Sequence, residues 1–491
     1  MPEAAMTPQE IRAAFQKALA FLQSGQPDRA EPLLTALLEP TQGAAEVHFH
    51  LSRVAEMRGE TGAQIDALTE ALHKKPDEPA VLTAAITAHS RHGDTAEVVA
   101  LYDRLIALKP RDIGTRADKA LYLQNTGDFE GAEKILRRLI RQNPNELELY
   151  RMLSTVTKLP RGDALVRQMR AFWPEKRLND HGRMHLGFAL AKVSEDSGQT
   201  DKVFAFLRPA NAAQGRLAPF DAPARDAEWR AFRAAQDVSD YSSPVAPLPQ
   251  RPVFVTGLPR SGTTLVEQII AAHSAARAGG EMGHALSQAV AQFGPAARAK
   301  PLGSLGAEEL GAYADRYTRL VRRDTGSAPG VVTDKSIQSH LVYGYIARAL
   351  PEARLIVVHR DPRDIALSIY RNHFALGTHR YATDLAAIAG TIKRFRENID
   401  WWRPRLGDRL HEIRYEDLVS DPESQARALI AAAGLEWENA CLDFHKSKGA
   451  VKTLSLAQVR QPIHAGRREA WRKYEADLAP FIAAWGDDPW D

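Results

Sequence analysis

A glycine recurs every 34 residues in the first part of the chain, at Gly25, Gly59, Gly93 and Gly127. The surrounding segments are alike: SGQPDRA, RGETGAQ, HGDTAEV and TGDFEGA. Glycine can adopt the left-handed conformation that ends a helix without a Cβ clash. A short helical pair cannot bury its apolar face alone, so a repeat of this length requires stacked neighbours. The chain is therefore predicted to begin with an array of helical pairs.

Prolines return at the same interval, each after a helical pattern: Pro76, Pro110 and Pro144. A period of 34 with glycine at the inter-helix turn and proline after the second helix resembles the tetratricopeptide repeat. Weaker matches to the repeat at Gly162 and Gly198 extend the predicted array to about Pro209, with six helical pairs. Its concave face would either bind a protein or peptide, or serve as a scaffold or dimerisation surface, and both alternatives stay open.

The sequence pattern predicts three segments. Residues 1–209 form the helical array, and residues 210–250 form a connector with a short helix around Glu228–Ala235 and a proline-rich end. Residues 251–491 form an α/β domain. This domain begins with a short apolar run, Val253–Thr256, which is typical of a buried parallel strand.

The sequence GLPRSGTT follows this strand and leads into a helix expected at Leu265–Ala272. A strand, a glycine-bounded loop and a helix point backbone amides at an anion. Gly257 and Gly262 have the spacing of a P-loop, but Thr263 stands where a nucleotide hydrolase has lysine. The loop therefore indicates another anion, with a structural turn as the alternative. Its polar side chains are Arg260, Ser261, Thr263 and Thr264.

A second buried strand is predicted at Leu355–Val358, and a helix at Ile365–Phe374. Arg360 follows the strand, and Ser368 lies eight residues later on the helix. The carboxyl end of a strand is the ligand side of an open α/β sheet. Further strand–helix units at Val331–Thr333 and Leu410–Arg414 favour a parallel three-layer domain.

GLPRSGTT resembles the 5′-phosphosulfate loop of sulfotransferases, and RDPRDIALS, beginning 100 residues after Arg260, resembles their 3′-phosphate motif. The resemblance covers most of Arg251–Asp491 and is greatest to tyrosylprotein sulfotransferases and bacterial repeat-containing sulfotransferases. It implies a P-loop-like three-layer sulfotransferase domain with a parallel sheet, preceded by the all-α tetratricopeptide superhelix. It also implies transfer of a sulfuryl group from 3′-phosphoadenosine 5′-phosphosulfate (PAPS) to a hydroxyl acceptor such as a protein tyrosine, a peptide or a glycan.

The resemblance also implies which residues bind PAPS. The 5′ end of PAPS would be held by Arg260, Ser261, Gly262, Thr263 and Thr264. The 3′-phosphate would contact Arg360 and Ser368, and Lys473 would contact the nucleotide.

The catalytic roles are likewise implied. GGEMG places Glu281 on the general base, and the segment after the third strand places Lys335 on a transition-state lysine. LSLAQVRQPI places Ser455 on a catalytic serine, and Arg260 would share the stabilisation of charge. The alternative for Glu281 is a carboxylate that favours a helix N-terminus, for Lys335 a solvated cation, and for Ser455 an ordinary loop serine.

Two departures from the family pattern stand out. Met282 replaces a second acidic residue, and Ile337 stands where small-molecule sulfotransferases have a catalytic histidine, so a histidine base of that type is not expected.

Two other functions stay open: a P-loop kinase, which the missing lysine disfavours, and an interaction protein with an inactive sulfotransferase-like domain.

Composition sets further expectations. The net charge of +3 indicates no nucleic-acid partner, and a lone cysteine excludes a cysteine-built metal site. No metal is required, because positioned cations and amides can neutralise the anion. No run approaches the roughly 20 apolar residues of a membrane helix, and the start lacks a targeting pattern. We therefore expect a cytoplasmic protein without membrane insertion.

Overall fold

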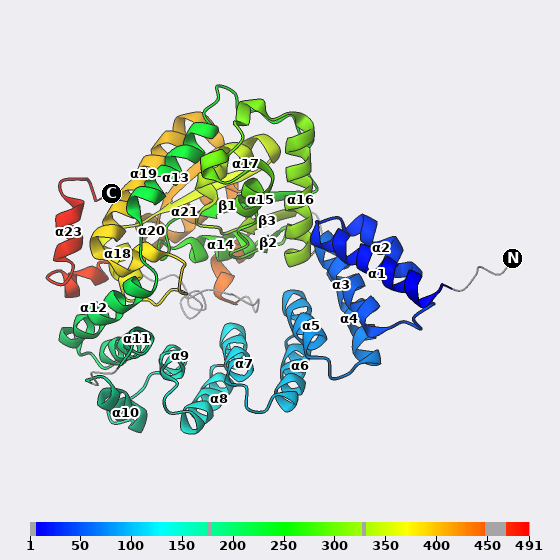
Figure 1. Ribbon diagram of the computed structural model, residues 1–491. Helices are drawn as coiled ribbons and strands as arrows, with labels where there is room; N and C mark the ends of the chain where they lie inside the picture. Colours follow the sequence, from blue (N-terminus) through cyan, green and yellow to red (C-terminus); the bar gives the residue numbers. More distant parts are fainter. Residues whose placement is uncertain (1–5, 175–177, 327–329, 447–467, 491) are drawn as a thin grey trace. The chain divides into compact units, whose positions relative to one another are not determined.

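The computed structural model describes residues 6–174, 178–326, 330–446 and 468–490. The first helices follow one another as six pairs in chain order (Figure 1): α1 (Pro8–Gln23) and α2 (Pro27–Ala36), α3 (Ala45–Arg58) and α4 (Thr61–Lys74), α5 (Pro79–His92) and α6 (Thr95–Leu108), α7 (Ile113–Thr126) and α8 (Phe129–Gln142), α9 (Leu147–Val156) and α10 (Ala164–Phe172), α11 (Asp180–Asp196) and α12 (Thr200–Leu217).

The repeated glycines lie in the turns between paired helices, as predicted. All four have left-handed backbone, with φ of +73° at Gly25, +77° at Gly59, +92° at Gly93 and +93° at Gly127. Helices α4, α6 and α8 each end two residues before a repeated proline. The prediction of helical pairs separated by glycine turns is confirmed.

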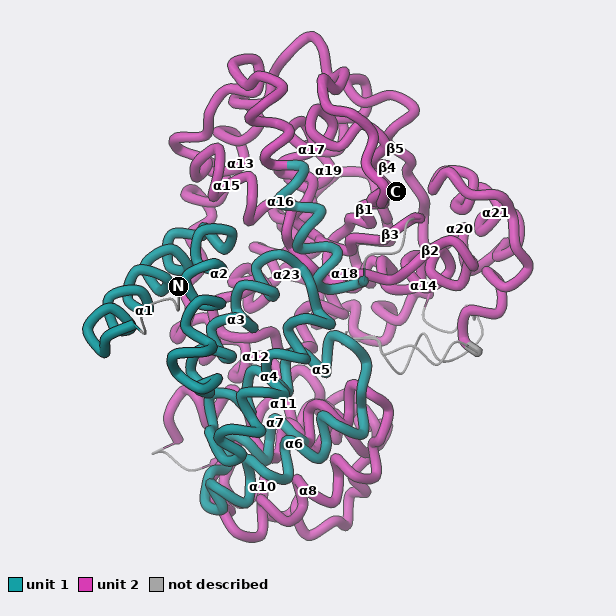
Figure 2. The backbone as a smooth tube through the Cα atoms, turned by 90° about the vertical axis from the view of Figure 1, so that its right-hand side faces the viewer, with its two compact units in different colours: residues 1–119, 314–329 teal, residues 120–313, 330–491 magenta. Residues whose placement is uncertain are grey.

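The chain divides into two compact units (Figure 2): residues 1–119 with 314–329, and residues 120–313 with 330–491. The C-terminal part of α16 (Ala307–Thr325) therefore belongs with the first helices. Within this first unit, Thr61 Oγ1 donates to the Arg323 carbonyl at 2.8 Å, and the ion pair of Arg91 with Asp324 measures 3.7 Å. The predicted boundaries at residues 209 and 250 follow the sequence patterns and stay predictions.

The segment 210–250 contains more helix than expected. α12 continues through Pro209 to Leu217, and α13 (Ala222–Ala235) begins six residues before the helix predicted there. Asp221 caps α13 by accepting from the Ala224 amide. The side chain of Gln236 then donates to the Leu341 carbonyl at 2.7 Å and accepts from the Gly344 amide at 2.9 Å. The segment thus packs into the second unit.

Within the described residues the second unit contains a parallel five-stranded sheet in the order β2-β3-β1-β4-β5. β3, β1 and β2 lie side by side in Figure 1. The strands are β1 (Gln250–Thr256), β2 (Ala276–Ala278), β3 (Gly330–Asp334), β4 (Arg354–His359) and β5 (Leu410–Arg414). The remaining helices are α14 (Thr263–Ala271), α15 (His284–Phe293), α17 (Tyr343–Ala349), α18 (Pro362–Tyr370), α19 (Leu385–Leu406), α20 (Tyr415–Ser420), α21 (Pro422–Ala432) and α23 (Ala479–Trp485).

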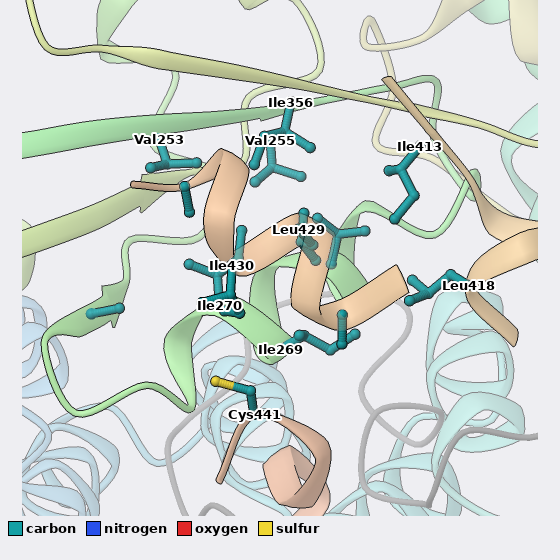
Figure 3. Close-up of a cluster of buried hydrophobic side chains, with 14 of the residues drawn as sticks. Val253, Val255, Ile269, Ile270, Ile356, Ile413, Leu418, Leu429, Ile430 and Cys441 are labelled. Atoms are coloured by element: carbon teal, nitrogen blue, oxygen red, sulfur yellow. The ribbon is translucent and has the colours of Figure 1, made fainter. Parts of the chain in front are cut away.

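Apolar side chains bury both faces of the sheet. On one face, Val253, Val255 and Ile356 pack over α14 and α21 (Figure 3). On the other face the alternate residues Phe254 and Leu355 are also fully buried. A parallel sheet covered on both faces is the expected three-layer arrangement. One local prediction is corrected: α18 ends at Tyr370 rather than Phe374 because the chain turns there. The edge strand β2 was not predicted.

The sheet order explains where the ligand loops meet. β1 lies between β3 and β4, and the register pairs Phe254 with Asp334 and Thr256 with Val357. The loops that follow these three parallel strands therefore leave the same edge, which is the ligand side of such a sheet.

Candidate active site

The loop between β1 and α14 depends on two glycines. A Cβ on Gly257 would lie 2.5 Å from Ser261 Oγ and 2.8 Å from the Val358 carbonyl oxygen. Gly262 has φ of +109° and is the N-cap of α14. Arg260 adopts φ of +73°, which is uncommon for a side chain with a Cβ. Such conformations cluster at functional sites, where the surrounding structure holds them in place.

Ser261 provides a test of whether the loop fits an anion. Its side chain is fully buried, and its Oγ has no hydrogen-bond partner among the described residues. An unsatisfied buried hydroxyl costs about 1–3 kcal/mol, so such groups are rare without a functional reason. The hydroxyl lies in the loop that leads into α14, and the N-terminus of a helix favours an anionic oxygen. The loop thus fits a phosphate or sulfate group.

The two sequence motifs meet in space. Arg260 Nε donates to Ser368 Oγ at 3.0 Å, and Arg360 Nη1 donates to the Arg260 carbonyl at 3.1 Å. Arg260 follows β1, whereas Arg360 follows the adjacent strand β4. Their proximity is a consequence of the strand order, and it assembles two guanidinium groups and a hydroxyl at one edge of the sheet.

Asp364 orients Arg360. This carboxylate is almost fully buried and accepts from Arg360 at 3.3 Å. It also accepts from the backbone amides of Glu469 at 3.0 Å and Trp471 at 3.1 Å. The Arg360 guanidinium lies over the Tyr415 ring, 4.4 Å from its centroid. One acidic side chain thus joins the start of α18 to the C-terminal segment and restricts the arginine.

Lys335 lies at the other side of β1. Only 2% of its side chain is exposed, and its Nζ lies 3.0 Å from Glu281 Oε1 and 3.4 Å from Thr264 Oγ1. The Glu281 side chain, by contrast, is 62% exposed. The alternative of a solvated lysine is therefore wrong. Glu281 also precedes α15 by three residues rather than capping it, since Gly283 is the N-cap.

Glu267 was missed by the sequence analysis. It is 2% exposed on α14, with Oε2 3.8 Å from Lys335 Nζ. Its Oε1 accepts from the Gly280 amide at 2.9 Å and from Thr333 Oγ1 at 3.1 Å. Burial raises the pKa of Glu267, and the nearby Lys335 charge opposes this shift. A carboxylate among the apolar residues of the predicted helix, in the segment TTLVEQIIA, was the available signal.

Glu281 and Lys335 line a cavity of about 920 Å³. Phe220, Asp221 and residues of the first half of α13 form one wall, and the segment 377–381 forms another. The segment predicted as a connector therefore contributes to the candidate site, which sequence spacing alone could not show.

The remaining predicted residues have different surroundings. Thr263 and Thr264 are buried in the first turn of α14. Lys473 is exposed in the 3₁₀ segment η7 (Ala470–Tyr474), and its side chain makes no hydrogen bond or ion pair with another described residue. Ser455 lies outside the described residues. No group of three or more His, Cys, Asp or Glu side chains in the described ranges could hold a metal ion.

None of the helices described for this chain has the length and apolar character needed to cross a bilayer.

Comparison with family models agrees with this architecture. Residues 252–439 match the sulfotransferase family, and residues 15–79 and 89–156 match tetratricopeptide repeats.

The chain is also similar to other proteins over different parts of its length. An uncharacterized protein of Aquifex aeolicus (strain VF5) is 29% identical over 402 residues, which cover 76% of this chain and 50% of that protein. Protein-tyrosine sulfotransferase 1 of Danio rerio is 23% identical over 260 residues, covering 48% of this chain and 72% of that protein. A solved sulfotransferase domain from the Synechococcus PCC 7002 olefin synthase is 18% identical, with a TM-score of 0.36 over 52% of this chain and 100% of that chain. The chain combines tetratricopeptide repeats with a sulfotransferase-family domain, and it resembles the protein-tyrosine sulfotransferases.

Proposed function

We propose that the second half of the chain transfers the sulfuryl group of PAPS to a hydroxyl acceptor. One observation carries this proposal. The cluster of Arg260, Arg360 and Ser368 lies at the same sheet edge as the buried Lys335, whose Nζ faces Glu281 in a large cavity. The cluster offers sites for phosphate oxygens, and the cavity offers room for an acceptor.

PAPS is the co-substrate in this proposal. Its 5′-phosphosulfate would lie on the loop between β1 and α14, held by backbone amides, the Ser261 hydroxyl and Arg260. Its 3′-phosphate would lie against Arg360 and Ser368, where a guanidinium can make two parallel hydrogen bonds to oxygens. The hydrogen bond between Arg260 and Ser368 links the two ends of this site.

The transfer step requires a base and a group that stabilises the leaving oxygen. Glu281 would accept the acceptor's hydroxyl proton as the oxygen forms a bond to sulfur. The bond between sulfur and the bridging oxygen breaks, and that oxygen stays on 3′-phosphoadenosine 5′-phosphate. Lys335 and Arg260 would stabilise its developing negative charge. The products are a sulfate ester and 3′-phosphoadenosine 5′-phosphate, and Glu281 returns the proton to solvent.

The exposure of the two partners suits these roles. A buried Lys335 is a fixed charge close to Thr264, so little reorganisation would accompany the reaction. The exposed Glu281 can exchange its proton with solvent. Glu267, 3.8 Å from Lys335 Nζ, would keep a carboxyl group near the ammonium when Glu281 turns to the acceptor.

Calorimetry with 3′-phosphoadenosine 5′-phosphate tests the donor site. We expect the natural protein to bind, and Arg360→Ala to lose at least about tenfold in affinity, since a charged hydrogen-bonded group is removed. Arg251→Ala is the control, because Arg251 lies near the start of β1, the end opposite to the loop. No binding, or equal losses in both variants, would overturn the proposal. Preferential binding of ATP with Mg²⁺ would favour a kinase instead.

A further inference from the structure

His379 lies in the wall of the same cavity as Glu281 and Lys335. Its backbone is left-handed, with φ and ψ both 43°, a conformation that few residues with a Cβ adopt. The residue precedes the 3₁₀ segment η4 (Arg380–Thr383), and its carbonyl accepts from the Ala382 amide at 2.8 Å. The turn therefore holds the imidazole at a defined position of the wall.

The imidazole has apolar contacts but no polar ones in the described ranges. Its ring centroid lies 4.8 Å from that of Phe374 and 6.1 Å from that of Tyr381. Nδ1 and Nε2 are both buried, and neither has a hydrogen-bond partner among the described residues. Two unsatisfied nitrogens on one ring are costly, and buried polar groups are normally paired.

The charge of the ring follows from its surroundings. Burial lowers the pKa of His379, and the negative charge of Glu281 opposes this shift without reversing it. Near neutral pH the ring is therefore uncharged. It offers one N–H donor and one nitrogen acceptor, a pair that matches a hydroxyl or an amide.

We propose that His379 is a positioning residue that hydrogen-bonds an uncharged hydroxyl or amide group of the acceptor and so directs the reacting oxygen toward Glu281. The inference rests on the proposed sulfuryl transfer. The cavity wall carries the apolar and aromatic side chains of Phe220, Leu286, Ile337 and Tyr381, together with charged groups such as Arg225 and Glu228. Such a wall favours an acceptor with a ring beside its polar group.

Three variants test this inference. His379→Phe keeps a ring against Phe374 but removes both nitrogens. His379→Asn keeps a donor and an acceptor, and asparagine tolerates left-handed backbone. His379→Gly removes the side chain while fitting the backbone angle.

The probe is 4-methylumbelliferone, whose fluorescence reports binding without turnover, titrated with and without 3′-phosphoadenosine 5′-phosphate. We expect His379→Phe and His379→Gly to raise its dissociation constant at least about tenfold. His379→Asn should stay within about threefold of the natural protein. Calorimetry should give an unchanged affinity for 3′-phosphoadenosine 5′-phosphate in all three variants.

Several outcomes would overturn the inference. One is a His379→Phe protein that binds the probe as the natural protein does. Another is failure of His379→Asn to restore binding, since asparagine supplies hydrogen bonds but cannot accept a proton as a base. A natural protein that does not bind the probe also contradicts it. Failure of the natural protein to bind 3′-phosphoadenosine 5′-phosphate would instead refute the proposed function. The failure of this inference and the failure of the proposed function are therefore distinguishable.

Discussion

The carboxylate of Glu281 and the ammonium of Lys335 lie 3.0 Å apart, yet one side chain is 62% exposed and the other 2% exposed. The pair therefore joins a fixed buried cation to a group in contact with solvent. This difference underlies the proposed division between charge stabilisation and proton transfer.

Glu281→Gln should lower kcat by about 100-fold or more while leaving the affinity for 3′-phosphoadenosine 5′-phosphate unchanged, because an amide cannot accept the proton. Transfer from radiolabelled PAPS measures the rate, and calorimetry measures the affinity. Glu228→Gln is a matched control, since Glu228 lines the same cavity and is ion-paired with Arg225. Full activity of Glu281→Gln would remove this residue from the mechanism.

Glu267→Gln should lower the free energy of unfolding by up to about 3 kcal/mol, because it removes one of two carboxylates near a buried ammonium. The amide oxygen can still accept from Gly280 and Thr333. Denaturant unfolding of Glu267→Gln, Lys335→Met and the double variant forms a double-mutant cycle. We expect the double variant to cost less than the sum of the single variants, whereas strict additivity would show that the two groups do not interact.

Gly59→Ala should destabilise the first unit more than Gly93→Ala does. Both glycines end a helix with left-handed backbone, so alanine costs roughly 1–2 kcal/mol at either position. At Gly59 a Cβ would also lie 2.1 Å from the Arg319 carbonyl of α16, whereas nothing lies within 4 Å at Gly93. Thermal unfolding of the two variants compares them, and equal losses would show that α16 does not pack closely on this turn.

Stability should decline on acidification, in part through His340. Burial lowers the pKa of His340 to about 3, whereas an unfolded histidine has a pKa of about 6.5. The unfolded chain therefore binds more protons between these values. The stabilising contribution is complete above about pH 6.5 and is lost as the pH falls toward 3.

A variant at this position tests the pH dependence. In His340→Asn an oxygen can replace Nδ1, which lies 2.7 Å from the Asn398 amide nitrogen. We expect the slope of unfolding free energy between pH 6 and 4.5 to fall by up to about 1.4 kcal/mol per pH unit. An unchanged slope would indicate that His340 does not titrate on unfolding.

Leu72→Glu tests whether the array binds the acceptor, which we propose to be a protein or peptide. Leu72 lies with Leu68, Glu97 and Arg104 in a cavity of about 400 Å³ between α4, α5 and α6. A carboxylate there should weaken an apolar contact. We expect kcat/KM to fall about tenfold for a polypeptide acceptor but not for 4-methylumbelliferone. Equal rates with the polypeptide would favour a scaffolding role.

Much of the fold could be predicted from local chemistry. The glycine period determined the helical pairs because left-handed helix ends favour glycine. Apolar runs such as Val253–Thr256 determined the buried strands. The edge strand β2 escaped prediction because three residues are too few to show a pattern.

The sequence by itself thus determined the two architectural types, and it predicted the loop between β1 and α14 as an anion site with candidate residues on either side of it. Only the tertiary structure decided that Arg360 contacts the Arg260 carbonyl, that Lys335 is buried beside Glu267, and that His379 lies in the cavity wall. Strand order and the packing of loops set these relationships. They depend on contacts between residues far apart in the chain, which local composition and spacing do not encode.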